Sequence, residues 1–241
     1  KVFDKIYDCI GMDWNLDEQL EYLQKIFPEY GKEYTPTVNI GLSLIDSFVL
    51  YSMIRKKIPN TIIEIGAGNS TIISLDAFKK NKNDGHNCKF YSIEPFPKSY
   101  LKQINQEGFK LIEKKLQDVE LSLLSEADLL FIDSSHVCKI DSDVNYEILE
   151  ILPNLKVGAI VHWHDIMIPT NYSKVWINQG NQFWNESYIV HAFMLFNKSF
   201  KIIWASRYMQ LNHPEKMKKQ FSYFYPDDME QQNSSFWIER V

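Results

Sequence analysis

Short apolar runs alternate with amphipathic segments along the chain from about residue 41 onward. Apolar runs between polar segments are typical of strands buried in a parallel sheet, and helices with one apolar stripe cover such a sheet. The pattern therefore predicts an α/β fold. The predicted strands are residues 61–65, 90–94, 110–113, 129–133 and 159–165, and the helices between them are residues 70–80, 98–106 and 141–152.

The alternation changes after residue 165. We expect a loop over residues 169–180 and a helix over residues 183–196. Two further strands, residues 200–205 and 235–239, are expected to pair antiparallel at one edge of the sheet. A polar and aromatic insertion, residues 207–233, separates these two strands.

The segment before the first strand divides into two parts. Residues 2–26 are predicted to be helical and to cap the site, and residues 41–57 are predicted to form a helix with an apolar face. We therefore expect residues 1–40 to be a small N-terminal helical cap and residues 41–241 to be the main domain.

A glycine loop follows the first predicted strand and opens the next helix. It reads Glu64-Ile65-Gly66-Ala67-Gly68-Asn69-Ser70-Thr71. Thr71 stands where a dinucleotide-binding loop has a third small residue, and no lysine follows as in a P-loop. An acidic residue and then G-x-G after an apolar strand indicates a loop for the amino acid and ribose of S-adenosylmethionine; a ligand-free turn is the alternative. The candidate cofactor-binding residues here are Glu64, Gly66, Ala67, Gly68, Asn69 and Ser70.

Polar residues also follow the second and third predicted strands. Glu94 ends the second strand beside two prolines, where an acidic side chain can accept hydrogen bonds from both ribose hydroxyls. An exposed glutamate without a ligand is the alternative. Gln117 and Asp118 follow the third strand and are weaker candidates for the adenine amino group.

Two aspartates, Asp133 and Asp165, end strongly apolar strands and are flanked by histidines. Neighbouring strands lie about 4.8 Å apart, so carboxylates at adjacent strand ends can share a divalent cation such as Mg²⁺ or Mn²⁺. His164 is a tentative third ligand, and His136 and His164 can exchange the roles of ligand and general base. Without a metal, Asp133 orients His164 as the base. For His162 we expect a hydrogen bond inside the core.

Composition narrows the possible partners. With 26 basic and 31 acidic residues the net charge is −5, which argues against nucleic acid. No apolar run reaches the roughly 18 residues of a membrane span. Cys9, Cys88 and Cys138 are far apart and odd in number, so a reducing compartment, the cytoplasm, is expected. A homodimer is compatible with the sequence.

These segments together resemble the class I S-adenosylmethionine-dependent methyltransferases. More narrowly, they resemble the bacterial family known as methyltransferase domain 24, found near glycan and natural-product biosynthesis genes. The resemblance covers roughly residues 40–241 and implies a Rossmann-like, seven-stranded, mostly parallel sheet in the order 3-2-1-4-5-7-6. Metal-dependent O-methyltransferases of this fold place acidic ligands where Asp133 and Asp165 stand. Ile166 replaces the asparagine that often follows the second aspartate. The resemblance rests on residues 64–71, 91–95, 131–136, 158–166, 183–186 and 235–238.

The resemblance implies methyl transfer to a hydroxyl of a sugar, a glycan or a secondary metabolite. Two alternatives remain: a metal-dependent, hydroxylase-like enzyme on the same fold, and a non-catalytic methyltransferase-like module of a larger synthase. Aromatic side chains after residue 169 form either a wall for the acceptor or ordinary core, and the insertion at 207–233 is expected on the acceptor side. The aromatic candidates are Tyr172, Trp176, Phe183 and Trp184.

Overall fold

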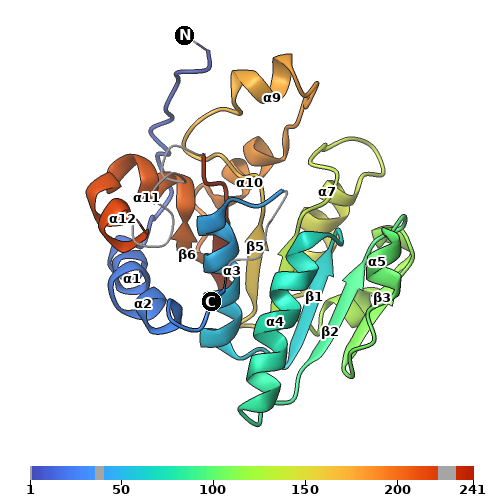
Figure 1. The fold of residues 1–241 in the computed structure, drawn as a ribbon. Coiled ribbons are helices and arrows are strands. Elements are labelled where there is room, and N and C mark those ends of the chain that lie inside the picture. Colours follow the sequence, from blue (N-terminus) through green and yellow to red (C-terminus); the bar gives the residue numbers. More distant parts are fainter. Residues whose placement is uncertain (1, 36–40, 222–231) are drawn as a thin grey trace.

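Seven strands form one sheet in the computed structural model, which describes residues 2–35, 41–221 and 232–241 (Figure 1). The order β3-β2-β1-β4-β5-β7-β6 confirms the predicted order. Strands β1 to β5 are parallel, and β7 runs antiparallel to both of its neighbours, β5 and β6. The strands are β1 Thr61–Ile65, β2 Lys89–Ile93, β3 Phe109–Ile112, β4 Leu129–Ile132, β5 Ile160–Trp163, β6 Phe200–Ala205 and β7 Phe236–Arg240.

Helices cover both faces of the sheet, which is why the central strands are apolar at nearly every position. On one face, Ile62 and Phe131 pack with α3 (Leu44–Lys57) and α4 (Asn69–Asn83), which lie side by side in Figure 1. On the other face, Ile63 and Leu130 pack against a second set of helices. That set comprises α6 (Leu121–Leu124), α7 (Asp143–Tyr146), η3 (Glu147–Ile151), α8 (Leu152–Asn154) and α10 (Glu186–Met194).

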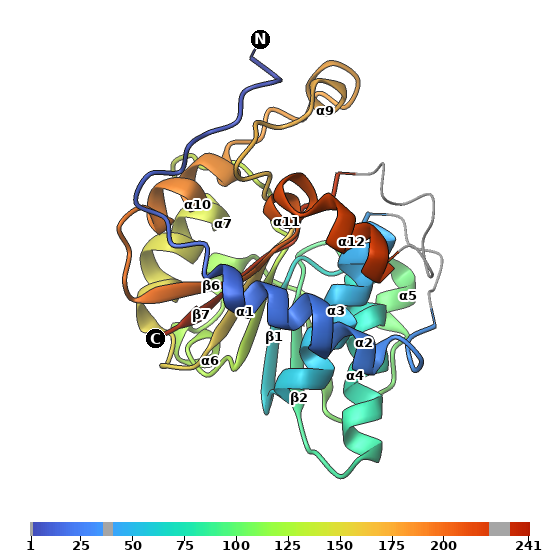
Figure 2. The same ribbon diagram turned by 90° about the vertical axis from the view of Figure 1, so that its left-hand side faces the viewer.

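The N-terminal segment is only partly helical, so the predicted helix over residues 2–26 was wrong in its first half. Ile6 forms an antiparallel bridge with Thr170, and α1 (Leu16–Glu21) begins much later. The helices α1, η1 (Tyr22–Ile26) and α2 (Phe27–Tyr30) pack beside α3 (Figure 2). Because Phe27 is fully buried in the same core as α3, this segment shares the core of the main domain. The proposed boundary at residue 40 falls beside residues 36–40, which lie outside the described residues.

Two other segments differ from the predicted pattern. Helix α5 spans only Ser99–Lys102. After it the chain turns towards β3 through hydrogen bonds between residues three positions apart, such as Gln103 N–H to Tyr100 C=O. The predicted loop at 169–180 contains α9 (Lys174–Asn178). The hydroxyl of Ser173 caps this helix by accepting the Trp176 N–H at 3.2 Å, a signal that the sequence did contain.

The predicted antiparallel pair β6–β7 is confirmed. Between these strands the insertion forms α11 (Ser206–Asn212) and α12 (Pro214–Phe221), and residues 222–231 lie outside the described residues. Met217 and Phe221 of α12 are buried in the core beside α3. Within the described part of the chain, no helix is both long and apolar enough to span a membrane.

Candidate active site

Gly66 lets the glycine loop leave β1 where another strand end blocks any side chain. Its φ of +85° lies in the left-handed region, and a Cβ atom there would stand 1.9 Å from the carbonyl oxygen of Asp133. Only glycine fits this turn. At Gly68 the backbone is extended and an added Cβ would have no neighbour within 4 Å. The loop therefore presents open space at its second glycine.

Glu64 lies behind this loop, fully buried, and not in open space beside it. Its carboxylate accepts hydrogen bonds from the hydroxyls of Ser70, Thr71 and Ser92 at 2.5–2.8 Å. Thr71 in turn accepts the Gly68 N–H at 3.1 Å, which gives a reason for threonine where a dinucleotide-binding loop has a third small residue. Burial raises the pKa of Glu64 to about 7 despite these hydroxyls. The side chains of Glu64 and Ser70 thus fix the shape of the loop.

A cleft of about 580 Å³ opens at the carboxyl ends of β1, β2 and β4, a size typical of small-molecule sites. Gly66, Glu94, Gln117 and Asp133 line it together. Asp118, which is exposed, is not among the lining residues, and neither are the half-buried loop residues Ala67, Gly68 and Asn69. The carboxylate of Glu94 accepts the Phe96 N–H at 2.8 Å, which orients it at the strand end.

Asp133, His136 and Asp165 form the tightest cluster of metal-type ligands among the described residues, with one ligand atom of each within 4.8 Å of the others. His136 Nε2 lies 3.2 Å from Asp133 and 3.8 Å from Asp165. Strands β4 and β5 are neighbours, so the predicted meeting of the two aspartates is confirmed. His136, and not His164, completes this group.

The backbone at this cluster is strained. His136 and Asp165 have φ of +57° and +58°, which non-glycine residues rarely adopt. Such conformations persist where the surroundings fix them, and they concentrate at functional sites. Here the carbonyl of His136 accepts the N–H groups of Asn185 and Glu186, and Ile166 N–H bonds to Ser234 C=O next to Asp165. Both turns aim their side chains at the same point.

Glu186, which sequence reasoning did not single out, supports the cluster from behind. Its carboxylate is fully buried and lies 2.7 Å from His136 Nδ1. Burial lowers the pKa of His136, but the hydrogen bonds to Asp133 and Glu186 outweigh it and raise the value to about 11. Glu186 thereby holds His136 Nδ1 while Nε2 faces Asp133 and Asp165, an arrangement that would suit a divalent cation if the ion replaced the proton on Nε2. The only sequence signal was its place in the Phe183–Glu186 segment.

His164 lies on the other side of Asp165. Its Nε2 is 3.1 Å from the Gly41 carbonyl oxygen and 3.4 Å from Asp165, and its ring is buried. His162 bonds to Ser235 Oγ at 3.0 Å inside the core, as predicted. Asp165 and His164 line a second cavity of about 390 Å³. The cluster thus contributes Asp133 to the first cavity and Asp165 to the second.

The four aromatic candidates have different surroundings. Trp176 lines the second cavity, and Trp184 packs on the ring of His136 with centroids 4.3 Å apart. Tyr172 is buried and its hydroxyl oxygen accepts the Ser187 N–H. Phe183 is 70% exposed. The structure therefore brings Trp176 to the cavity wall and Trp184 to the Asp133–His136–Asp165 cluster.

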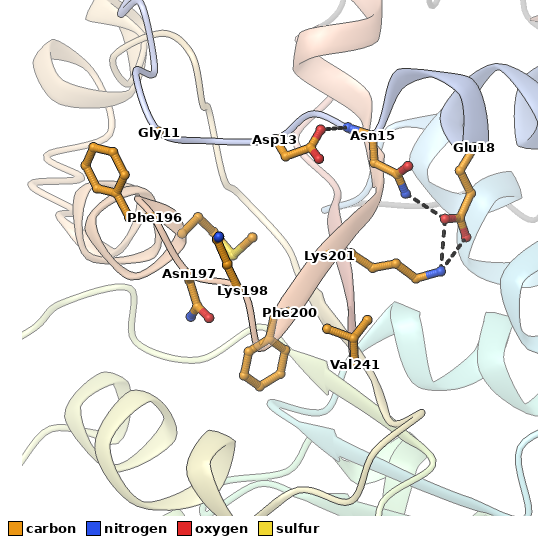
Figure 3. A pocket seen from close by; sticks show the side chains of 11 residues that line it. Gly11, Asp13, Asn15, Glu18, Phe196, Asn197, Lys198, Phe200, Lys201 and Val241 are labelled. Carbon is orange, nitrogen blue, oxygen red and sulfur yellow. Dashed lines mark hydrogen bonds and ion pairs between the residues drawn. The ribbon is translucent and has the colours of Figure 1, made fainter.

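A third cavity, of about 620 Å³, lies at the opposite end of the sheet, at the start of β6 (Figure 3). The charged side chains that line it bond to one another: the Glu18 carboxylate accepts hydrogen bonds from Lys201 and from Asn15, as the dashed lines in Figure 3 show. None of the predicted site residues lines it. The chemistry-bearing residues therefore lie at the other two cavities.

The sheet order and the glycine loop at the end of β1 define the class I methyltransferase fold. Residues 63–166, which include the loop and both aspartates, match the family model described as a methyltransferase domain. Over this segment the match agrees with the family resemblance predicted from the sequence.

Individual relatives are distant. An uncharacterized protein of Archaeoglobus fulgidus is 32% identical over 129 residues, which is 48% of this chain and 58% of that protein. Among solved structures, the methyltransferase PaMTH1 of Podospora anserina, bound to S-adenosylhomocysteine, is 14% identical with a TM-score of 0.51, covering 96% of this chain and 89% of its own. The O-methyltransferase TomG of Streptomyces achromogenes is 14% identical with a TM-score of 0.47, covering 92% and 89%. The first of these structures supports the fold.

Proposed function

We propose that this protein is an S-adenosylmethionine-dependent methyltransferase that methylates a hydroxyl of a sugar, a glycan or a secondary metabolite. The observation that carries the proposal is the position of the Asp133–His136–Asp165 cluster, which contributes one residue to each of two cavities. A donor in the first cavity and an acceptor in the second would meet at this cluster. Methyl transfer is an in-line displacement, so such a meeting supplies much of the catalysis.

The donor would occupy the cleft lined by Gly66 and Glu94. Its amino acid part would lie against the glycine loop, with Glu94 accepting the ribose hydroxyls and Gln117 near the adenine. The side-chain amide of Gln117 donates to the Asp141 carbonyl at 2.9 Å, which links two segments that line the cleft. Glu64 and Ser70 act indirectly by fixing the loop.

The acceptor hydroxyl must lose a proton, and the cluster offers two groups for this step. A divalent cation fits Asp133, Asp165 and His136, because they supply two carboxylates and one imidazole at close range. An imidazole in the set favours Mn²⁺, Fe²⁺ or Zn²⁺ over Mg²⁺. Such an ion would lower the pKa of a bound hydroxyl. His164 lines the second cavity beside Asp165 and would accept the proton on Nε2 in the tautomer that carries its hydrogen on Nδ1, which would replace the present hydrogen bond from Nε2 to the Gly41 carbonyl.

Donor binding is the direct test of this proposal. Calorimetry with S-adenosylhomocysteine should show binding to the unaltered protein, and Glu94→Ala should weaken it by about 1.5–3 kcal/mol, the usual value of a hydrogen bond to a charged group. NAD serves as the control ligand, because it also carries a ribose. Absence of S-adenosylhomocysteine binding, or equal binding of NAD, would contradict the proposal.

Transfer of a labelled methyl group, measured before and after chelation, tests the catalytic cluster. We expect chelation to remove activity and add-back of Mn²⁺ to restore it. Asp165→Asn is a suitable variant because asparagine tolerates the left-handed backbone at this position. An unchanged rate after chelation, together with a fully active Asp165→Asn, would make the cluster structural.

A further inference from the structure

Another buried carboxylate, that of Asp46, lies in the first turn of α3 and is fully shielded from solvent. It accepts the Ser206 hydroxyl at 2.6 Å and the Ser234 N–H at 2.8 Å. Burying a carboxylate is costly unless its partners are well placed. One of these two partners, Ser234, also forms a hydrogen bond with Asp165 of the proposed catalytic cluster.

Ser234 is held at three points. Its N–H bonds to Asp46, its carbonyl accepts the Ile166 N–H at 2.9 Å, and its hydroxyl donates to Asp165 Oδ1 at 3.1 Å. Because the backbone of Ser234 is fixed on both sides, its hydroxyl has a defined position. Asp165 Oδ1 is thereby occupied, and it is Asp165 Oδ2 that lies 3.8 Å from His136 Nε2.

We propose that Asp46 and Ser234 are positioning residues that orient the Asp165 carboxylate, leaving Oδ2 free for a divalent cation shared with Asp133 and His136. This inference rests on the metal component of the proposed function. Groups behind a ligand fix its orientation in metal sites, and their loss typically costs 10–100-fold in metal affinity. The route runs from α3 through the start of β7 to the end of β5, so three elements jointly set one ligand.

Titration of the full chain with Mn²⁺ alone, followed by electron paramagnetic resonance of the free ion, tests this without an acceptor or a donor. Ser234→Ala removes only the hydroxyl that reaches Asp165, and it should weaken Mn²⁺ binding about 10-fold. Ser234→Thr restores a hydroxyl and should recover most of the affinity. Asp46→Asn should also weaken binding, because the amide cannot accept from both of its present donors.

Ser206→Ala is the matched control. It removes a hydroxyl that also bonds to Asp46, but this serine leads to the indole N–H of Trp204 and not to the cluster. Its Mn²⁺ affinity should equal that of the unaltered protein, while urea unfolding reports any general loosening in each variant. An equal loss in Ser206→Ala and Ser234→Ala, or no loss in Ser234→Ala, overturns the inference.

The outcome for the unaltered protein separates this inference from the proposed function. If it binds S-adenosylhomocysteine and Mn²⁺ but Ser234→Ala binds Mn²⁺ equally well, only the positioning role fails. If it binds S-adenosylhomocysteine and no Mn²⁺, the metal component and the positioning role fail together while the donor assignment stands. Asp46→Asn need not fold for this test, because Ser234→Ala and Ser234→Thr carry it.

Discussion

Gly66 and Gly68 of the glycine loop have different reasons to be glycine, and substitution should separate them. Gly66→Ala places a Cβ 1.9 Å from the Asp133 carbonyl oxygen at a positive φ, so we expect a loss of roughly 2–5 kcal/mol in unfolding free energy. A Cβ at Gly68 would meet no neighbour within 4 Å, so Gly68→Val should lose much less stability than Gly66→Ala. Its side chain should instead occupy ligand space and abolish S-adenosylhomocysteine binding.

Urea unfolding and calorimetry on the same two variants check this pair. Gly85→Ala is a useful comparison, because Gly85 also has a positive φ but its Cβ would meet nothing within 4 Å. Gly85→Ala should lower the unfolding free energy less than Gly66→Ala does, and the difference measures the steric clash with the Asp133 carbonyl. A Gly68→Val protein that binds S-adenosylhomocysteine normally would show that the donor does not approach this side of the loop.

Glu64 should make the protein less stable as the pH rises from about 5 to 8. Its pKa is raised to about 7 by burial, so between its ordinary value and 7 the folded protein holds a proton that the unfolded chain has released. Stability is therefore lost as the pH rises through this window, by about 2–3 kcal/mol in total. Glu64→Gln should flatten the dependence. Urea unfolding at both pH values measures it, and identical slopes in the two proteins would contradict the assignment.

Among single residues, those that follow long apolar runs were predictable. Asp133 and Asp165 stand where buried strands end, and parallel strands bring their carboxyl ends to one edge. Glu186 was not predictable in the same way, because a glutamate at the start of a helix usually faces water. Its burial depends on the His136 turn, which is formed by residues fifty positions earlier. The interchange of His136 and His164 has a similar origin: the left-handed turn at His136 is not visible in the sequence.

Helix α10 acts on the cluster through its first turn. Because Glu186 is one of the two groups that raise the pKa of His136 to about 11, Glu186→Gln should lower that pKa by about 1–3. A nuclear magnetic resonance titration of the imidazole protons measures this in the protein without ligands. The His191 signal, from the same helix, is an internal control. An unchanged His136 titration would mean that Asp133 alone sets its protonation.

At the scale of elements, strands were predicted better than helices. The central strands are apolar at nearly every position because both faces are covered, and this gives a signal over four or five residues. Short helices give weaker signals: α5 has four residues and α9 has five. The N-terminal segment was misassigned because its apolar residues suit helical spacing, whereas residues before Leu16 pair with the chain near Thr170. That partner is 164 positions away.

At the scale of the whole molecule, the sheet order was available only from the family resemblance. The position of β7 between β5 and β6 came from the resemblance alone, because nothing in the local sequence of Phe236–Arg240 specifies its neighbours. The second cavity was likewise not predictable. It combines Gly41 at the start of α3, Asp165 after β5 and Ser234 before β7.

The close approach of Gly66 to the Asp133 carbonyl joins the glycine loop and the proposed ion-binding carboxylate in one tight contact. Neither can shift without the other, so occupancy of one site should be felt at the other as thermodynamic linkage. We expect S-adenosylhomocysteine to change the affinity for Mn²⁺ by about 5-fold or more, and Mn²⁺ to change the affinity for S-adenosylhomocysteine by the same factor. Calorimetric titration of each ligand with and without the other closes this cycle. If each ligand binds with the same affinity whether or not the other is present, the ends of β1 and β4 move independently. The protein could then bind its donor and its ion in either order without preference.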